Sequence, residues 1–139
     1  MANKFSVLLA DDDIEDQDIL KEYLLRELPG LTIYSFLNGK DAVSWLDKCA
    51  EDDLPSLIIL DYKMPIMNAV ETLEYLENNS RYSSIEKVVW STSIRNEYKN
   101  ICIDRGASRY FSKPCNFSDL KKITSELLGY LVKDKVNIS

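Results

Sequence analysis

The sequence predicts an α/β fold in which five strands alternate with five helices in a doubly wound parallel sheet. Short apolar runs bounded by polar or turn residues recur along the chain, as is typical of buried strands. Between them lie segments whose apolar residues recur at three- and four-residue steps, the spacing of an amphipathic helix. Strands that are apolar throughout need helices on both faces of their sheet, and right-handed crossovers between parallel strands supply them.

Five apolar runs are the expected strands. They span residues 5–10, 31–36, 57–60, 88–90 and 109–111. The run at 109–111 has the weakest pattern of the five. Because turn or polar residues bound each run, each strand is expected to be short.

Three helical segments follow the first three expected strands. The first helix should end at Pro29-Gly30, which is a stop signal, and the second should begin after Asn38-Gly39. The third occupies the segment after the strand at 57–60. The apolar positions of these helices are Ile19, Leu20, Tyr23, Leu24 and Leu28, then Val43, Trp45 and Leu46, then Val70, Leu73 and Leu76.

Two further helices complete the alternation. The fourth, at 96–104, has a partial apolar stripe, and the fifth is expected to be capped by Ser118-Asp119. The fifth helix carries Leu120, Ile123, Leu127 and Leu131 on one face. We therefore expect one domain over residues 1–133 and a short polar tail over residues 134–139.

Composition restricts the function classes. The chain has 139 residues, the size of one domain, and its net charge of −6 does not favour nucleic-acid binding. It contains no His, and its three Cys residues have no metal-like spacing, which excludes zinc sites and Ser-His or Cys-His catalysis. The first apolar run is too short for a signal peptide or membrane span, so we expect a cytoplasmic protein without membrane association.

Polar side chains stand at the ends of four of the five expected strands. They are Asp11, Asp12 and Asp13 after the first, Asp61 at the third, Ser91 and Thr92 at the fourth, and Lys113-Pro114 after the fifth. In doubly wound sheets the ligand crevice lies at these carboxyl ends. Carboxylates brought together repel one another unless a cation neutralises them, and Mg²⁺ prefers carboxylates with phosphate oxygens.

Each of these features alone has a simpler interpretation. Asp12 or Asp13 could cap the first helix, and Lys113-Pro114 could form an ordinary turn. Ser91-Thr92 could be a solvated strand end. The combination at four strand ends instead favours metal-assisted phosphoryl transfer.

Four motifs in the same order resemble the response-regulator receiver family, of the chemotaxis-regulator-like, stand-alone single-domain type. They are LLADDD, IILDYKMP, VVWSTS and GASRYFSKP, and together the resemblance covers nearly the whole chain. The resemblance implies a flavodoxin-like sheet with strand order 2-1-3-4-5. It also implies a two-component signal transduction protein that works by phosphorelay.

The resemblance assigns a phosphorylation and metal site. By the match of IILDYKMP, Asp61 is the phosphoacceptor, a nucleophile and a metal ligand. Asp11 and Asp12 correspond to the family's acidic pair, and the backbone carbonyl of Lys63 completes the protein's ligands for Mg²⁺. We expect no enzyme activity beyond self-phosphotransfer and autodephosphorylation at Asp61.

The resemblance also assigns a switch. Lys113 and Ser91 are expected to contact the phosphoryl group, and Ser91 with Tyr110 to change position after phosphorylation. Lys63 and Ser93 lie where they could modulate dephosphorylation.

The partners follow from the same resemblance. A sensor histidine kinase or a histidine phosphotransfer protein would donate the phosphoryl group, and a downstream protein target would bind the switched surface. A phosphorylation-dependent homodimer is a further expectation. Tyr98 and Tyr110 either form an output surface or simply pack.

The chain departs from the family pattern at a few positions. Asn68-Ala69 replaces a frequent Asp-Gly and removes a Gly that tolerates a left-handed backbone. Cys115, beside Lys113-Pro114, is expected to be a small, partly buried side chain rather than a redox sensor. Trp45 and Trp90 are expected to pack in the core or against the sheet.

Two other functions remain open. Asp11 and Asp13 have the DxD spacing of haloacid-dehalogenase-like phosphohydrolases, in which one carboxylate attacks and the other protonates. A receiver-like binding module without phosphoryl turnover is the second. The presence of Asp12, Asp61 and Lys113 together argues against that second alternative.

Overall fold

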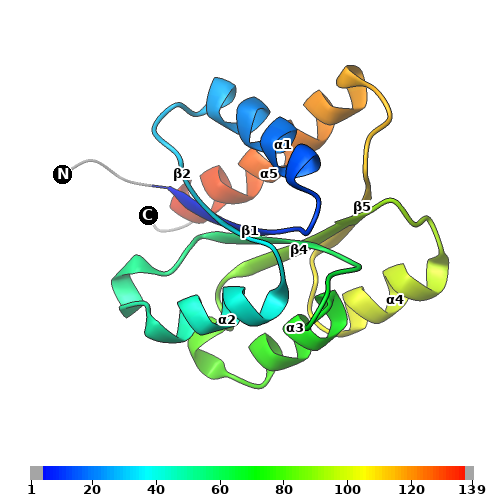
Figure 1. Cartoon of the computed structure of the whole chain (residues 1–139). Helices are drawn as coiled ribbons and strands as arrows, with labels where there is room; N and C mark the ends of the chain where they lie inside the picture. The colour runs from blue at the N-terminus through cyan, green and yellow to red at the C-terminus, as the bar shows by residue number, and fades with distance from the viewer. Residues whose placement is uncertain (1–4, 137–139) are drawn as a thin grey trace.

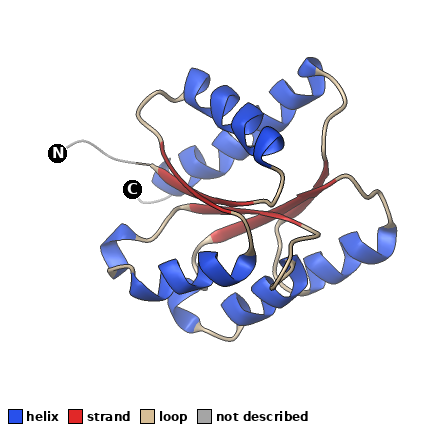
Figure 2. Ribbon diagram, in the orientation of Figure 1, coloured by secondary structure: helices blue, strands red, loops and turns tan. Residues whose placement is uncertain are grey.

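The computed structural model describes residues 5–136 and contains a five-stranded parallel sheet with helices on both faces (Figure 1, Figure 2). The strand order is β2-β1-β3-β4-β5, so the predicted order is confirmed. The strands are β1 (Ser6–Ala10), β2 (Thr32–Phe36), β3 (Leu57–Asp61), β4 (Glu86–Ser91) and β5 (Arg109–Ser112). All five predicted strands exist, with ends shifted by one or two residues.

The five predicted helices are also present, together with two single 3₁₀ turns. They are α1 (Ile14–Glu27), α2 (Gly39–Lys48), α3 (Ala69–Glu77), α4 (Asn96–Asp104) and α5 (Phe117–Val136), with η1 (Glu51–Asp53) and η2 (Ser80–Tyr82). Among the described residues no helix is both long and apolar enough to cross a bilayer.

The start and end of α5 differ from the prediction. The side-chain oxygen of Asn116 accepts a hydrogen bond from the Asp119 backbone N–H at 2.8 Å, so Asn116 and not Ser118-Asp119 caps the helix. The helix continues through Val136. The helix therefore extends into the expected tail at residues 134–136, and residues 137–139 lie outside the described part of the chain.

Alternating side chains divide the core into two layers. Val7 and Leu9 of β1 pack toward α1 and α5, whereas Leu8 and Ala10 pack toward α2, α3 and α4. All five residues of β3 are buried, as expected for a central strand covered on both faces. Figure 1 shows α1 and α5 above the sheet and the other three helices below it.

Side-chain caps fix where helices begin at the carboxyl edge of the sheet. Asp13 accepts a hydrogen bond from the Asp16 N–H at 3.1 Å, which confirms a cap in the Asp triplet. Asn68 and Glu71 form a capping box at α3. Because Ala69 is the first helical residue, Gly is not needed there. A left-handed backbone occurs instead at Ile66, with φ of 69°.

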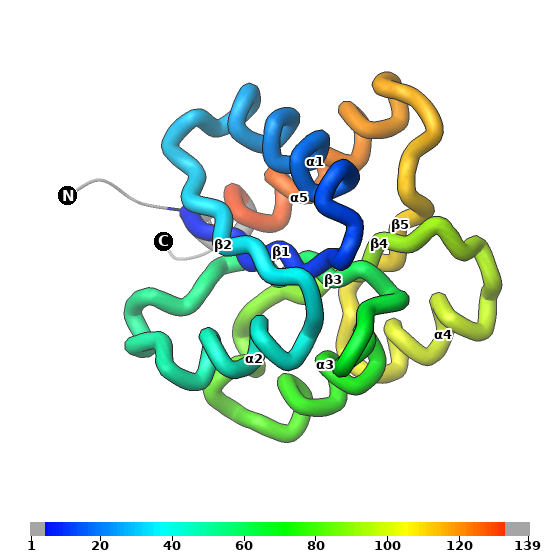
Figure 3. Tube along the Cα trace, viewed as in Figure 1, coloured from blue at the N-terminus to red at the C-terminus, as the bar shows by residue number. Residues whose placement is uncertain are grey.

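The loops that follow the parallel strands leave the same edge of the sheet, on the right in Figure 3. One close approach stabilises this edge. The Gly39 N–H donates to the Met67 carbonyl at 3.1 Å, and a Cβ at Gly39 would overlap Thr72 Oγ1 and lie 2.7 Å from that carbonyl oxygen. Only Gly lets the start of α2 lie against the β3–α3 loop in this way.

Candidate functional site

Three carboxylates meet at the carboxyl edge of the central strands. Asp61 is the last residue of β3 and Asp11 follows β1, and pairing of these two strands places their side chains together. Asp61 is 7% exposed and Asp11 is fully buried, while Asp12 faces solvent. One carboxylate oxygen from each residue lies within 4.8 Å of the others. The structure thus brings together the three predicted side-chain metal ligands.

Lys113 is the cation of this cluster. Its Nζ lies 2.9 Å from Asp11 Oδ2, 3.4 Å from Asp61 Oδ1 and 2.9 Å from Asp16 Oδ2. The Lys113 side chain is 9% exposed. Its predicted place beside Asp61 agrees with the geometry, whereas the contact with Asp16 was not predicted.

Burial and mutual repulsion dominate the electrostatics of the carboxylates. Burial and the charge of Asp11 raise the pKa of Asp61 to about 8, although Lys113 opposes the shift. The pKa of Asp11 is raised as well, mainly by burial. Burial alone would lower the pKa of Lys113, but its hydrogen bond to Asp16 and its contact with the Asp11 carboxylate outweigh burial and raise this pKa. With all of its carboxylates ionised, the cluster would carry more negative charge than one lysine neutralises.

The donor set fits a hard divalent cation. Asp11 Oδ2 is buried and makes no hydrogen bond of normal geometry among the described residues, although the Lys113 ammonium lies 2.9 Å away. A metal ion could satisfy this oxygen together with those of Asp12 and Asp61. The predicted contribution of the Lys63 carbonyl stays a prediction.

The predicted switch residues are linked through Ser93. Ser91, at the end of β4, is 2% exposed, and its Oγ accepts a hydrogen bond from the Ser93 N–H at 3.1 Å. The Tyr110 hydroxyl donates to the Ser93 carbonyl oxygen at 3.1 Å. Tyr110 is thereby tied to the same loop that positions the Ser91 hydroxyl.

An aromatic group lies beside the site. The Tyr62 ring stacks on Tyr98 with 4.3 Å between centroids and meets Tyr110 edge-on at 6.4 Å. Lys63 is exposed, with Nζ 5.9 Å from the Tyr98 ring centroid. Tyr98 and Tyr110 are half-buried, so they pack against Tyr62 and also reach the surface.

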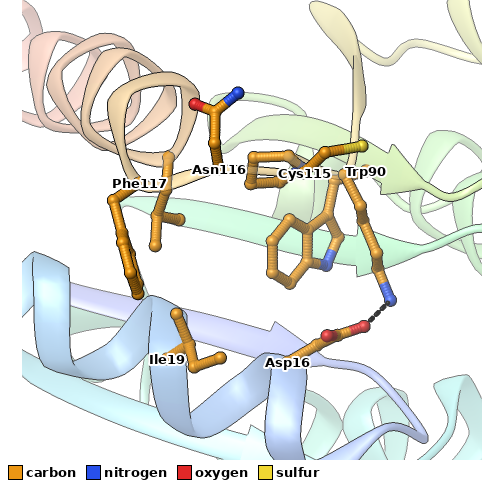
Figure 4. A pocket seen from close by; sticks show the side chains of 9 residues that line it. Asp16, Ile19, Trp90, Cys115, Asn116 and Phe117 are labelled. Carbon is orange, nitrogen blue, oxygen red and sulfur yellow. Dashed lines mark hydrogen bonds and ion pairs between the residues drawn. The ribbon is translucent and has the colours of Figure 1, made fainter.

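A cavity of about 260 Å³ opens next to the cluster, between α1 and the start of α5 (Figure 4). Asp16, Trp90 and Lys113 line one side of it. Trp90 is buried, as predicted, and Lys113 Nζ lies 5.0 Å from the centroid of its ring. Cys115 is exposed at this cavity, so the prediction that it is partly buried is wrong.

Sequence reasoning missed two residues of α1 that support the site. The Gln17 side-chain amide donates to the carbonyl oxygens of Asp11 at 2.7 Å and Phe36 at 2.8 Å, which fixes the β1–α1 loop. Asp16 contacts Lys113 across 97 positions of sequence. The cap at Asp13 predicts where α1 begins, but no local pattern connects Asp16 with so distant a lysine.

Comparison with known proteins identifies similar domains. The sequence profile of the response regulator receiver domain matches residues 7–125. The two-component response regulator ARR17 of Arabidopsis thaliana is 28% identical over 93% of this chain and 88% of its own length. Two-component response regulator ORR5 of Oryza sativa subsp. japonica is 30% identical over 88% of this chain and 87% of its own.

Some curated relatives are longer than the matched segment. The chain spans 64% of two-component response regulator ARR8 of Arabidopsis thaliana, to which it is 26% identical. Among solved structures, the phosphorylated cyanobacterial phytochrome response regulator RcpA has a TM-score of 0.84 at 23% identity, covering 94% of this chain and 95% of its own. The Mn²⁺-bound response regulator Rcp1 has a TM-score of 0.80 at 24% identity, with coverages of 91% and 94%. These two structures establish the shared fold.

Proposed function

This chain belongs to the response regulator receiver domain family, and we propose that it accepts a phosphoryl group on Asp61. The observation that carries the proposal is the convergence of Asp61, Asp11 and Lys113 from three strand ends into one buried cluster. A carboxylate nucleophile, further acidic oxygens and a fixed ammonium group are the components that phosphoryl transfer to aspartate requires.

The donor would be a phosphohistidine on a sensor histidine kinase or a histidine phosphotransfer protein. A carboxylate oxygen of Asp61 attacks phosphorus, a P–O bond forms, and the P–N bond breaks with its electron pair leaving on the imidazole nitrogen. Lys113 would stabilise the negative charge on the transferring oxygens, because its Nζ already lies 3.4 Å from Asp61 Oδ1. In autodephosphorylation, water would attack the acyl phosphate, release inorganic phosphate and return the free Asp61 carboxylate, and we propose no other enzyme activity.

We assign the metal to the same cluster. Asp11, Asp12 and Asp61 would hold Mg²⁺ with the backbone carbonyl of Lys63. When bound, the ion would neutralise the carboxylates and offset charge on the phosphoryl oxygens. The Mn²⁺-bound form of response regulator Rcp1, which shares this fold, supports a divalent cation here.

Phosphorylation would change the surface through Ser91 and Tyr110. A Ser91 hydroxyl that turns to donate to the phosphoryl group would stop accepting from the Ser93 N–H, and the Tyr110–Ser93 contact would change with it. We describe this as a population shift between two packings, in which the phosphoryl group favours one. Lys63 and Ser93, beside the site, would modulate dephosphorylation.

The changed surface would bind a downstream protein or a second copy of the chain. Alternatively, the phosphorylated domain would pass its phosphoryl group to another protein in a relay. A relay role is supported by similarity to the peroxide stress-activated histidine kinase mak1 of Schizosaccharomyces pombe, 29% identical over 96% of this chain and 8% of the kinase. We propose that these events occur in the cytoplasm, without nucleic acid or membrane as a direct partner.

The geometry does not favour the phosphohydrolase alternative. Asp13, which would be the acid in that mechanism, caps α1 through the Asp16 N–H and is exposed. Asp11, which would attack, is fully buried against Lys113. A binding module without phosphoryl turnover remains the alternative that experiment must exclude.

Asp61→Asn should abolish phosphorylation of the chain. Incubation with phosphoramidate and Mg²⁺ should add one phosphoryl group to the wild-type protein and none to this variant, because the amide is not a nucleophile. Intact-protein mass spectrometry measures the addition. Asp52→Asn, in the exposed turn η1 at the opposite edge of the sheet, is the matched control and should label normally. No labelling of folded wild-type protein would support the binding module instead.

A further inference from the structure

Three carboxylates compete for the ammonium group of Lys113. An ammonium group has three N–H donors, and Nζ faces three carboxylates at 2.9, 2.9 and 3.4 Å. The two short contacts are with Asp11 and Asp16, and the long one is with Asp61. Donation from Lys113 to phosphoryl oxygens on Asp61 would therefore compete with its contacts to Asp11 and Asp16.

Asp16 is the partner that Lys113 can release most easily. Its side chain is 34% exposed, so water can solvate the carboxylate after the contact breaks. Asp11 is fully buried, and losing the lysine there would leave a charge without a counter-ion. Asp16 stands in the first turn of α1 and lies at the edge of the cavity described above, which Lys113 also lines.

Trp90 offers Asp16 a replacement donor. The residue is 3% exposed, and its indole Nε1–H has no hydrogen-bond partner among the described residues. A buried N–H without an acceptor is unfavourable, so an acceptor that becomes free nearby should be bound. Figure 4 shows the indole nitrogen turned toward the Asp16 carboxylate, and the Lys113 ammonium lies 5.0 Å from the ring centroid.

We propose that Asp16 is a positioning residue that holds Lys113 back from Asp61 in the unphosphorylated protein and accepts a hydrogen bond from the Trp90 indole when Lys113 leaves it. The inference rests on the proposed function, since phosphoryl oxygens on Asp61 are what draw the lysine away. Asp16 competes for Lys113 and therefore weakens binding of a phosphoryl group. The Trp90 indole stabilises the released Asp16 carboxylate. Its hydrogen bonding therefore reports whether Lys113 has left Asp16.

The test uses the indole N–H resonance of Trp90 in ¹H–¹⁵N NMR spectra. The chain has two Trp residues, and Trp45→Phe identifies the signal of Trp90. The phosphoryl analogue beryllofluoride, added with Mg²⁺, should move this resonance downfield in the wild-type protein, as a new hydrogen bond requires. In Asp16→Ala the resonance should not move downfield, because the acceptor is absent.

Calorimetry of beryllofluoride binding gives a second readout. Asp16→Ala and the isosteric Asp16→Asn should bind about twofold to fivefold more tightly than wild type, the range expected for loss of one partly exposed ion pair. Asp16→Glu should return the affinity toward the wild-type value. Asp18→Ala, at an exposed acid of α1 that lies 3.8 Å from the Lys21 ammonium, removes the same charge and should change neither readout.

The outcomes separate the inference from the proposed function. If wild type binds beryllofluoride and Asp16→Asn binds no more tightly, or if the Trp90 resonance shifts equally in Asp16→Ala, the role of Asp16 is wrong while phosphorylation of Asp61 stands. If wild type does not bind beryllofluoride at all, the proposed function fails and this inference fails with it.

Discussion

The pKa values of Asp61 and Asp11 depend on burial and on the charged groups around them. Each carboxylate is buried next to another, and Lys113 is the one cation within 4 Å of both among the described residues. Burial disfavours the charged form of Asp61, and Asp11 adds repulsion. At this scale, ionisation of Asp61 would create an unbalanced negative charge that a divalent cation would neutralise.

This imbalance predicts that stability falls with pH in the absence of a divalent cation. The pKa of Asp61 is about 8 in the folded protein and near 3.8 when unperturbed, so the folded state retains a proton that the unfolded chain loses between these values. The stabilising contribution is therefore fully present below about pH 4 and lost as pH rises through about 8. Urea unfolding at about pH 6 and about pH 9 measures the loss.

Two controls sharpen this prediction. Asp61→Asn should be more stable than wild type at about pH 9 without metal by on the order of 1–3 kcal/mol, because it removes the buried charge. Saturating Mg²⁺ should reduce the difference, since the ion replaces the proton. A free energy of unfolding with the same pH dependence in both proteins would contradict this view of the cluster.

At the scale of elements, hydrophobic spacing and turn residues predicted which segments form strands and helices, but not all of their ends. Asp13 was recognised as a capping candidate because three acids precede a helical stripe. The cap at Asn116 was missed, because Ser118 and Asp119 are equally good capping residues two positions later. Local sequence does not decide which of these residues caps the helix. The left-handed backbone at Ile66 could not be predicted either, because a β-branched residue does not indicate a positive φ angle.

The contact between α2 and the β3–α3 loop predicts a cost for Gly39→Ala. The added Cβ would overlap Thr72 Oγ1 and press on the Met67 carbonyl, so we expect a loss of about 1–3 kcal/mol in the free energy of unfolding. Gly129→Ala, in α5, where the new Cβ would meet nothing within 4 Å beyond the neighbouring backbone of its own helix, is the matched control and should stabilise by about 0.5–1 kcal/mol. Urea unfolding compares them, and equal effects would show that the loop is not closely packed.

At the scale of the whole molecule, the fold and the main site could be predicted because strand alternation places all carboxyl ends at one edge. The meeting of Asp11, Asp61 and Lys113 follows from that topology, whereas the order of the strands was implied by the resemblance to the receiver family. The contacts of Asp16 and Trp90 could not be predicted, because they depend on how α1 and the β5–α5 loop pack together. Such side-chain positions are decided by tertiary packing and leave no periodic pattern in the sequence.

The central claim is that one carboxylate in the whole chain accepts the phosphoryl group. Borohydride reduces an aspartyl phosphate to an alcohol, and peptide mass spectrometry of the reduced, phosphoramidate-treated protein locates that change among all 23 Asp and Glu residues. We predict reduction at Asp61 alone, dependent on Mg²⁺. Reduction at Asp11 would instead indicate the phosphohydrolase arrangement, and reduction at no carboxylate would contradict phosphoryl transfer to this domain.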